Sequence, residues 1–291
     1  MTKIHPTAII DPTARIGDAV EIGPYCVIGA DVEIGAGTVL MNHVTVLGPT
    51  TMGRNNTVFP LAVLGADPQD RKYRGEKSRL VVGDGNQFRE HVTIHRGTAN
   101  GGGSTTIGDR NLVMVGAHIA HDCHLGHQIQ LANHVMLAGH VRIEDGATIS
   151  GGTGVHHFVT IGTLSFVGGL ARISRDVPPF MTVEGNPAEV RSPNRTGMER
   201  RGFDESHIEA IRECYRRLFV ENGGPMADRM RSLRDEFPDV PAVAKLCDAL
   251  AARAEGVHGR SLEVLRQDKK RTLQLQPLHI SEEHQKAPHE A

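Results

Sequence analysis

Residues 16–40 read IGDAVEIGPYCVIGADVEIGAGTVL, and an aliphatic side chain recurs in this stretch at every sixth position. An α-helix repeats every 3.6 residues and a strand every two, so neither element alone explains this period. A triangular prism does, because three units of six residues, each a short strand and a corner, make one coil. We expect the coils to stack at the strand spacing of about 4.8 Å, with the aliphatic side chains directed inward.

The repeat extends over nearly two thirds of the chain. Apolar residues hold every sixth position in three series, 4–64, 82–94 and 107–173. The interruptions at 65–80 (GADPQDRKYRGEKSRL) and 98–105 (TANGGGST) predict loops that leave the prism. Glycine often follows the aliphatic residue, and we expect these glycines to allow tight corners because glycine tolerates strained backbone.

The remaining sequence predicts a small helical domain. Prolines at 178, 179, 187 and 193 indicate a linker, so we divide the chain into a β-helix domain, 1–190, and a helical domain, 191–268. Ser206 and Glu209 have the spacing of a capping box for the first helix. Further helices are expected over 226–236 and 241–255. The polar, aperiodic residues 269–291 predict a disordered tail.

Composition argues against several classes of protein. The net charge of −2 over 291 residues is not typical of a nucleic-acid-binding protein. No run of about 18 uncharged apolar residues is present, so we expect no membrane span. The N-terminus lacks the apolar core of a signal peptide, and the four cysteines have no metal or redox spacing. A cytoplasmic protein with buried thiols is expected.

Histidines are unusually frequent between residues 91 and 157. Residues 18 apart lie above one another on adjacent coils, so the prism predicts a column of His121, Gly139 and His157. A histidine can act as a general base near neutral pH, and the bare N–H of a glycine can stabilise an oxyanion. Asp122 is a candidate orienting partner for His121. The alternative is that the histidines are polar residues on solvated corners.

Several strings together resemble the UDP-N-acetylglucosamine O-acyltransferases, enzymes of the first step of lipid A biosynthesis. The resemblance implies a left-handed parallel β-helix, and it is the only ground for the left hand, since the general rule for parallel crossovers favours the right hand. It covers residues 3 to about 255. It rests on PQDRKYRGE (68–76), VTIHRGT (92–98), AHIAHDCHLG (117–126), LAGHV (137–141), GVHHF (154–158), RDVPPF (175–180) and RRGF (200–203).

The resemblance implies a role for particular side chains. His121 would be the general base that activates the glucosamine 3-hydroxyl, and Gly139 would be the oxyanion donor. Gly169 and Pro187 would lie along the acyl chain, and a glycine at 169 is similar to the members that use longer chains. The residues implied in substrate binding are Gln69, Asp70, Lys72, His118, His140, His156, His157, Asn194, Arg200 and Arg201.

The sequence departs from the family pattern at three positions. His157 stands where glutamine is common, Pro187 where histidine is frequent, and Thr196 where an acidic residue is common. These departures affect the details of substrate recognition more than the class of reaction.

The resemblance also implies partners. The acyl donor would be acyl carrier protein, the acceptor UDP-N-acetylglucosamine or its 3-amino variant, and the assembly a homotrimer with sites between neighbouring prisms. Arginines between 172 and 217 would supply a basic docking surface for the acidic carrier protein. No metal or organic cofactor is implied beyond the phosphopantetheine of the donor.

Other functions of the same prism remain open at this point. One is a later N-acyltransferase of lipid A biosynthesis, and another is a sugar acetyltransferase that uses acetyl-CoA. A third is a zinc carbonic anhydrase with three histidine ligands. A non-catalytic scaffold subunit is the fourth.

Overall fold

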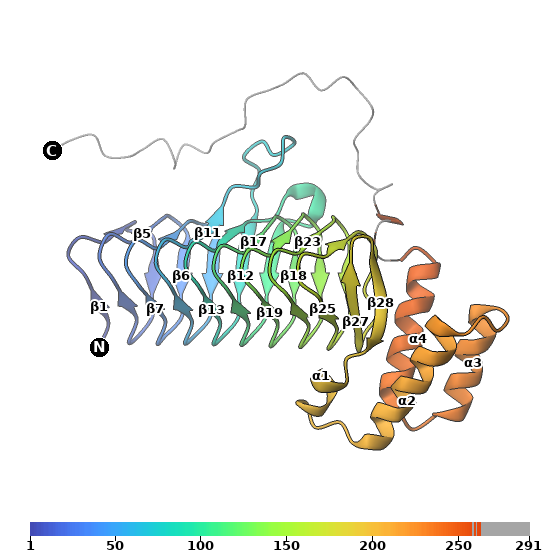
Figure 1. Ribbon diagram of the computed structural model, residues 1–291. Coiled ribbons are helices and arrows are strands. Elements are labelled where there is room, and N and C mark those ends of the chain that lie inside the picture. Colours follow the sequence, from blue (N-terminus) through green and yellow to red (C-terminus); the bar gives the residue numbers. More distant parts are fainter. Residues whose placement is uncertain (258, 260, 263–291) are drawn as a thin grey trace.

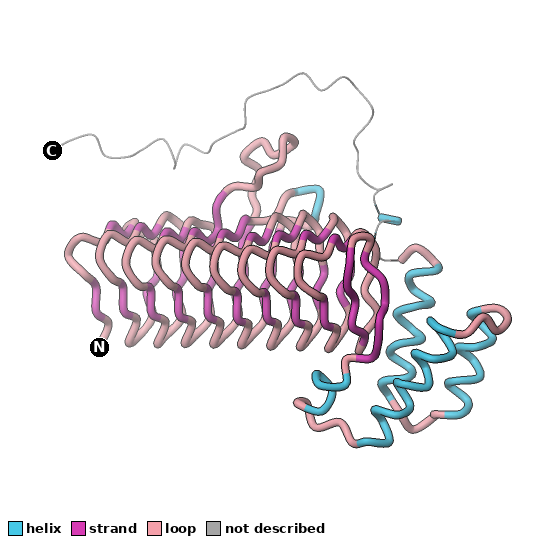
Figure 2. The backbone as a smooth tube through the Cα atoms, viewed as in Figure 1, coloured by secondary structure: helices cyan, strands magenta, loops and turns pink. Residues whose placement is uncertain are grey.

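The computed structural model, which describes residues 1–257, 259, 261 and 262, is a parallel β-helix followed by a small helical domain (Figure 1). Within these residues the strands form three sheets of 11, 9 and 8 strands. We name them A, B and C in the order in which the chain first enters them. From β1 to β24 the chain passes from A to B to C in every coil, so each of these coils has an A–B, a B–C and a C–A corner (Figure 2).

The strands have the following bounds. Sheet A contains β1 (Lys3–Ile4), β4 (Glu21–Ile22), β7 (Val39–Leu40), β10 (Thr57–Val58), β13 (Gln87–Phe88), β16 (Leu112–Val113), β19 (Gln130–Leu131), β22 (Thr148–Ile149), β25 (Phe166–Val167), β27 (Met181–Gly185) and β28 (Ala188–Pro193). Sheet B contains β2 (Ile9–Ile10), β5 (Val27–Ile28), β8 (Thr45–Val46), β11 (Val63–Ala66), β14 (Thr93–His95), β17 (His118–Ile119), β20 (Met136–Leu137), β23 (Gly154–Val155) and β26 (Arg172–Ile173). Sheet C contains β3 (Arg15–Ile16), β6 (Val32–Ile34), β9 (Thr50–Met52), β12 (Arg79–Val82), β15 (Ser104–Ile107), β18 (His124–Leu125), β21 (Arg142–Ile143) and β24 (Thr160–Ile161).

The register confirms the coil of 18 residues. Ile4 pairs with Ile22 in neighbouring parallel strands. At the two predicted loops the paired residues are more than 18 positions apart in sequence. Val58 pairs with Phe88, and Phe88 in turn pairs with Val113. The insertions therefore lengthen single coils without disturbing the stack.

The aliphatic residues of the repeat form the core of the prism. Every such position from Ile22 to Ile173 is buried, whereas Ile4, Ile10 and Ile16 remain partly exposed at the open first coils. A fully buried aliphatic side chain contributes about 1.5–3 kcal/mol relative to an exposed one. This ladder of small aliphatic side chains takes the place of large aromatic ones.

The glycines after the aliphatic residues act differently from our expectation. Strained corner conformations belong mostly to other residues, such as Tyr25 with φ of 58° and Asp122 with φ of 60°. A Cβ atom on Gly35 would instead lie 2.4 Å from the carbonyl oxygen of Gly53 on the next coil. Apart from Gly29, which has room for a Cβ atom, and Gly65, which has a positive φ, most of these glycines are required by the close stacking of coils.

A β-hairpin occupies the segment in which the prolines indicated a linker, so the linker prediction is wrong. β27 pairs in parallel with β25 and antiparallel with β28, and thus ends sheet A. The prolines fit an edge hairpin because they stand before it, at its turn and at its last residue, where no ladder N–H is needed.

The helical domain contains α1 (Arg195–Glu199), α2 (Glu205–Tyr215), the π-helical turn η2 (Arg216–Val220), α3 (Met226–Glu236) and α4 (Pro241–Ala254). The start of α2 differs from the predicted capping box. Asp204 is its N-cap, with Oδ1 accepting from the N–H of His207 at 2.9 Å, and the hydroxyl of Ser206 donates to the same carboxylate. The expected tail, 269–291, lies outside the described residues.

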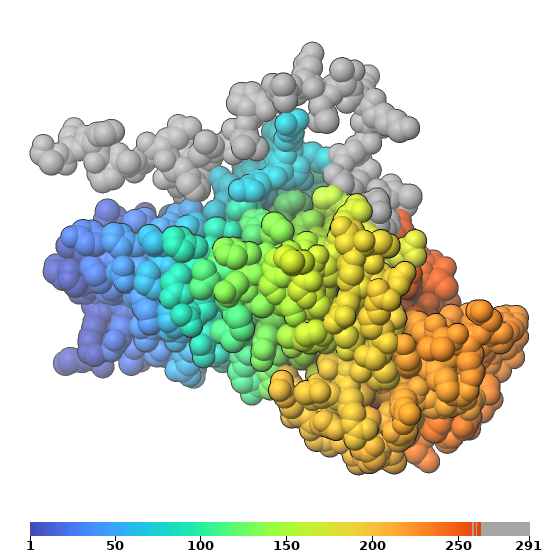
Figure 3. Space-filling view, viewed as in Figure 1, coloured from blue at the N-terminus to red at the C-terminus, as the bar shows by residue number. Residues whose placement is uncertain are grey.

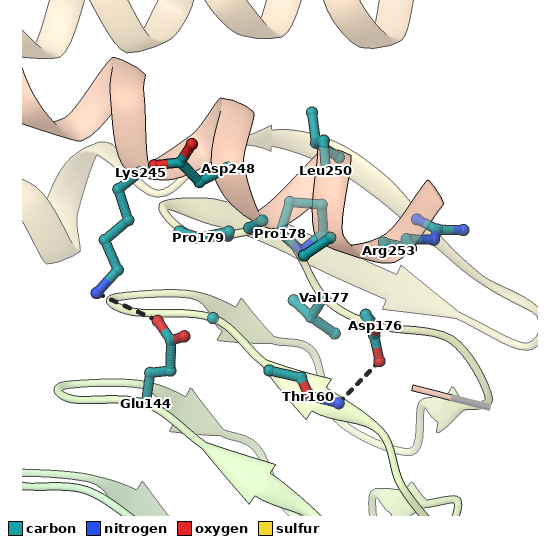
Figure 4. A pocket seen from close by; sticks show the side chains of 13 residues that line it. Glu144, Thr160, Asp176, Val177, Pro178, Pro179, Lys245, Asp248, Leu250 and Arg253 are labelled. Carbon is teal, nitrogen blue, oxygen red and sulfur yellow. Dashed lines mark hydrogen bonds and ion pairs between the residues drawn. The ribbon is translucent and has the colours of Figure 1, made fainter. Parts of the chain in front are cut away.

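The helical domain packs against the last coils of the prism, at the end opposite the N-terminus (Figures 1 and 3). One apolar cluster joins Phe180 and Met181 of the β-helix with Ile211 and Leu246 of the helices. Beside it, a cavity of about 270 Å³ separates α4 from the corners of the prism, bordered by an ion pair of 3.3 Å between Lys245 and Glu144 (Figure 4). Among the described residues, no helix is long and apolar enough to cross a membrane.

Candidate active site

The B–C corners of the prism gather most of the chemistry that the sequence indicated. Both inserted loops, 67–78 and 96–103, connect a strand of sheet B to the following strand of sheet C. They project side by side from the same edge (Figures 1 and 2). His121 and Asp122 form the B–C corner of a neighbouring coil, and Gly139 and His140 form that of the next.

His121 and Asp122 form a hydrogen-bonded pair. Nδ1 of His121 lies 2.7 Å from Oδ2 of Asp122. The positive φ of Asp122, 60°, lets its carboxylate reach the ring of the preceding residue, which an extended strand would prevent. The side chain of Asp122 is fully buried, while that of His121 retains 14% exposure.

The proton on this hydrogen bond can be assigned from the charge of Asp122. Burial would raise the pKa of Asp122, but hydrogen bonds from His121 and Thr98 outweigh burial and hold that pKa below its ordinary value. Asp122 is therefore an acceptor, and Nδ1 of His121 carries the hydrogen. Nε2 keeps its lone pair, which is the form that a general base requires.

Gly139 lies directly against the ring of His121. A Cβ atom at this position would be 2.6 Å from Cε1 and 2.8 Å from Nε2 of the histidine. The N–H of Gly139 donates to no other described residue. The predicted column is thus present at these two levels, with an available backbone donor beside the basic nitrogen.

Two of the predicted histidines, His140 and His118, lie next to this pair. The ring of His140 stands edge-on to that of His121, with centroids 5.2 Å apart. Burial lowers the pKa of His140 to about 4, so this histidine is neutral at pH 7. His118, on β17, shares a hydrogen bond of 2.8 Å with the hydroxyl of Thr93, and burial lowers its pKa as well.

His95 was missed as a candidate by the sequence analysis. It is buried, its ring centroid is 4.8 Å from that of His118, and burial lowers its pKa to about 3. The signal that could have found it is register, because Ile94 pairs with Ile119 across the inserted loop. Residues of the string VTIHRGT are thereby placed next to those of AHIAHD.

His156 and His157 lie one coil further along the prism. Their rings contact each other edge-on with centroids 4.5 Å apart. His157 of the predicted column also acts electrostatically on His140 of the adjacent coil.

The polar loop 67–78 is tied to the prism by a buried arginine, Arg96. Its guanidinium donates to the carbonyl oxygens of Gly48 and Gly65 at 2.5 and 2.9 Å, to the hydroxyl of Tyr73 at 3.2 Å, and to the carboxylate of Asp67. The last contact is an ion pair in which Arg96 is only 5% exposed. The base of the loop is thus held by one charged side chain.

The three loop residues implied in substrate binding differ in environment. Gln69 is exposed, and the carboxylate of Asp70 accepts from the N–H of Lys72 at 3.0 Å. The negative charge of Asp70 acts on His140, so the loop and the histidines belong to one electrostatic neighbourhood.

The remaining predicted residues lie on other edges of the prism. Asn194 caps α1 and donates to the carbonyl oxygen of Leu164 at 2.8 Å, and Arg201 reaches that of Gln128 at 3.4 Å. Leu164 and Gln128 are at C–A corners. Arg200 is exposed beside Arg201.

The two positions implied in acyl-chain length are also separated from His121. Gly169 is exposed at an A–B corner, and Pro187 stands at the turn between β27 and β28. One chain therefore does not bring all the predicted site residues together.

A metal centre fits this site poorly. His121, Asp122 and His140 bring ligand-type atoms within 4.8 Å of one another. However, the 2.7 Å between His121 and Asp122 is shorter than the roughly 3.3 Å that two ligands on one tetrahedral zinc would keep. Both carboxylate oxygens of Asp122 already accept from Thr98. The geometry matches an oriented base instead.

A β-helix of hexapeptide repeats with an oriented histidine on one edge defines the class of hexapeptide-repeat transferases. Residues 1–36 match the family model of the bacterial transferase hexapeptide (six repeats). Residues 176–258 match the model of UDP-N-acetylglucosamine O-acyltransferase, domain 2.

Relatives and solved structures agree with these models. Acyl-[acyl-carrier-protein]–UDP-N-acetylglucosamine O-acyltransferase of Myxococcus xanthus is 52% identical over 75% of this chain and 85% of its own, and that of Stutzerimonas stutzeri is 46% identical over 88% and 99%. The structure of LpxA from Acinetobacter baumannii has a TM-score of 0.82 at 44% identity, over 85% of this chain and 96% of its own. The chain belongs to the UDP-N-acetylglucosamine O-acyltransferase family, and its fold is the left-handed parallel β-helix of that family.

Proposed function

We propose that this protein transfers a 3-hydroxyacyl chain from acyl carrier protein to the 3-hydroxyl of UDP-N-acetylglucosamine, the first step of lipid A biosynthesis, in the cytoplasm. Family membership supports the substrates over the N-acyl, acetyl, carbonic anhydrase and scaffold alternatives. The single observation that carries the mechanism is the pair of His121 and Asp122, because it leaves a lone pair on Nε2 of a side chain that is 14% exposed.

The chemistry follows from the position of that lone pair. Nε2 of His121 takes the proton of the sugar hydroxyl while the oxygen attacks the thioester carbonyl and a C–O bond forms. Asp122 stabilises the imidazolium that results. The carbonyl oxygen becomes negative and accepts from the free N–H of Gly139. When the C–S bond breaks, the imidazolium returns its proton to the departing thiolate of the phosphopantetheine arm, and no other cofactor takes part.

Substrate recognition divides between the loop and the other edges in this proposal. Gln69, Asp70 and Lys72 contact the sugar and diphosphate from the B–C edge. The forked guanidinium groups of Arg200 and Arg201 suit phosphate oxygens, with Asn194 shaping their loop. His118, His140, His156 and His157 line the reacting region.

We also propose a homotrimer whose active sites lie between prisms. The supporting observation is that His121, Arg201 and Gly169 occupy three different edges of one prism, so a single chain leaves the predicted set of residues separated. Neighbouring prisms with parallel axes would bring edges of different chains together. Mass photometry should find an assembly of three 31.5 kDa chains, and a monomer at working concentration would contradict this arrangement.

The carrier protein would dock near the end of the prism. Most described arginines of the helical domain are paired with a carboxylate, as Arg216 is with Glu213 and Arg234 is with Asp248. Arg172 and Arg175 are exposed and form no ion pair with another described residue. These two are therefore better candidates for contacting an acidic partner than the arginine-rich helices as a whole.

The deciding experiment measures acyl transfer from 3-hydroxyacyl carrier proteins of several lengths to UDP-N-acetylglucosamine. His121→Ala should lower kcat by about 10²–10⁴-fold, which is the usual contribution of a general base. His43→Ala is the matched control, because His43 is an exposed corner histidine of the first coils that stacks on Tyr25. No transfer by folded wild type, to this acceptor or to its 3-amino variant, would refute the proposed function.

The same assay tests acyl length. A Cβ atom on Gly169 would meet nothing closer than 3.6 Å, so the position is open, and we propose that it admits a longer chain. Gly169→Met should shift the preference to shorter donors. An unchanged length profile would remove Gly169 from this role, and Pro187→His in the same assay tests Pro187.

A further inference from the structure

We propose that Thr98 is a positioning residue. It holds the carboxylate of Asp122 in place, and its hydroxyl and the ring of His121 both donate to the same charged oxygen of Asp122. This inference rests on the proposed role of His121 as the base. Oδ2 of Asp122 accepts from the hydroxyl of Thr98 at 2.7 Å, and Oδ1 accepts from the backbone N–H of Thr98, also at 2.7 Å. The same Oδ2 accepts from Nδ1 of His121 at 2.7 Å. One threonine thus engages both carboxylate oxygens.

The direction of the hydroxyl bond is determined by its surroundings. Thr98 caps the short 3-10 helix η1 (Ala99–Gly101), and its hydroxyl oxygen accepts from the N–H of Gly101 at 3.2 Å. A carboxylate has no proton to give, so the single hydroxyl proton of Thr98 points to Asp122. The hydroxyl therefore competes with the imidazole for the charge on Oδ2.

The loop that follows Thr98 covers the carboxylate. A Cβ atom on Gly101 would lie 1.9 Å from Cγ of Asp122, which shows how closely the backbone approaches. Thr98 is 2% exposed and Asp122 is 1% exposed. With this cover in place, water has no ready route to replace a lost hydroxyl, and Thr98 has almost no surface with which to contact a substrate.

Other charged and titratable groups near the pair define the background. Nε2 of His140 lies 3.8 Å from Oδ2 of Asp122, and the loop 98–103 carries no charged side chain. Other titratable neighbours are Glu76, which accepts from the N–H of Ala99 at 3.4 Å, His95 and His118 beside His121, His124 and Cys123 beside Asp122, and Asp70 and His157 beside His140. These groups stay in place when only the Thr98 hydroxyl is removed.

Removal of the hydroxyl changes the proton affinity of His121 in one direction. Oδ2 then has the imidazole as its one side-chain donor, so its full charge stabilises the protonated ring. Thr98→Val should move the acid limb of the kcat profile upward by about 0.5 to 1 pH unit. We expect kcat at the optimum to fall about tenfold, because the carboxylate also loses an anchor. KM should stay within about twofold for both substrates, since Thr98 is covered.

The test compares Thr98→Val with Thr98→Ser, which keeps the hydroxyl and should restore the wild-type profile. A second readout is the pH dependence of carbethoxylation of His121 by diethylpyrocarbonate, followed by peptide mass spectrometry. The reagent attacks the neutral ring, so the midpoint should rise by the same amount. It needs no substrate, and therefore tests Thr98 even if the proposed acyl transfer fails.

An unshifted midpoint in folded Thr98→Val, with activity lowered equally at all pH values, would reduce Thr98 to a purely structural role and overturn the proposal. If Thr98→Val does not accumulate as folded protein, Thr98→Ala removes the same hydroxyl with less bulk. An unshifted midpoint in Thr98→Ala overturns the proposal equally.

Discussion

The ring of His121 packs directly against the backbone of Gly139, and any Cβ atom at position 139 would lie 2.6 Å from Cε1 of the histidine. The two residues are 18 positions apart in sequence and belong to successive coils. The bare glycine therefore serves two purposes in the proposed mechanism. It leaves its N–H open to the oxyanion, and it leaves room for the imidazole.

Gly139→Ala tests this relationship. Gly139 does not need a positive φ, so alanine fits the backbone, but its methyl group must displace the ring of His121. We expect kcat to fall by at least about 10²-fold, because a misplaced base loses most of its contribution. The thermal midpoint should change little, since the displaced atoms belong to a side chain.

Gly29→Ala is the matched control for that variant. Its Cβ atom would make only ordinary contacts, the nearest at 3.5 Å, and it lies in an early coil. Wild-type activity in Gly139→Ala would show that the ring of His121 does not have to stay where the structure places it.

The buried histidines predict a loss of stability in mild acid. Burial lowers the pKa of His95 to about 3. Below pH 6.5 His95 therefore binds a proton in the unfolded chain but stays neutral in the folded chain. Stability should therefore fall as the pH drops from 6.5 towards 4, by about 1.4 kcal/mol per pH unit for each such histidine. Carboxylates with lowered pKa, such as Asp122, act only below about pH 4.

His95→Gln should make stability less dependent on pH, and denaturant unfolding at pH 7.5, 6.0 and 5.0 measures this dependence. His43 is exposed, so His43→Gln should keep the wild-type slope of stability against pH. Equal slopes in wild type and His95→Gln would mean that the folded protein protonates His95 freely.

The anchor of the polar loop gives a third prediction. Asp67→Ala leaves the charge of the buried Arg96 without its carboxylate partner, and we expect a loss of about 3–5 kcal/mol in the free energy of unfolding. The released loop should raise KM for the sugar nucleotide more than it lowers kcat, if Asp70 and Lys72 bind that substrate.

Lys77→Ala provides the comparison, because Lys77 is an exposed residue of the same loop. It should leave stability within about 0.5 kcal/mol of wild type. Urea unfolding measures the loss of stability, and steady-state kinetics measure the change in KM. An unchanged KM in Asp67→Ala would show that the loop does not contribute to substrate binding.

The helical domain offers a contrast between two neighbouring residues of α4. Leu246 is fully buried in the apolar cluster shared with the prism, so Leu246→Ala should cost about 2–5 kcal/mol. The ion pair of Lys245 with Glu144 is partly exposed, and Lys245→Ala should cost less than about 1 kcal/mol. Urea unfolding followed by circular dichroism at 222 nm measures both, and the reverse order would mean that the ion pair holds the domain in place.

Some of the site was predictable because residues 18 positions apart lie above one another in the prism. The stacking of His121 on Gly139, the burial of the aliphatic ladder and the two loops follow from a period of 18 residues. Asn194, Arg200 and Arg201 were implied only in substrate binding, and it is the structure that places Asn194 and Arg201 on the C–A edge. A resemblance implies which residues form the site, but it does not say which of them lie close together within a single chain.

Other contacts were outside the reach of the period. The loop that begins at Thr98 interrupts the repeat, so its path is decided by its own hydrogen bonds to Asp122. The same holds for Arg96, whose partners come from three separate segments. Sequence alone ranks neither residue above its neighbours.

The sequence by itself determined the prism, its register and the order of its edges, because every coil repeats one short-range rule of aliphatic burial. Only the tertiary structure decided the direction of the Asp122 carboxylate, the cover that Thr98 and Gly101 place on it, and the burial of His95. These depend on insertions that fold back on the coils, and on a corner residue with positive φ. Such features arise from the packing of segments distant in sequence, and a local repeat carries no information about that packing.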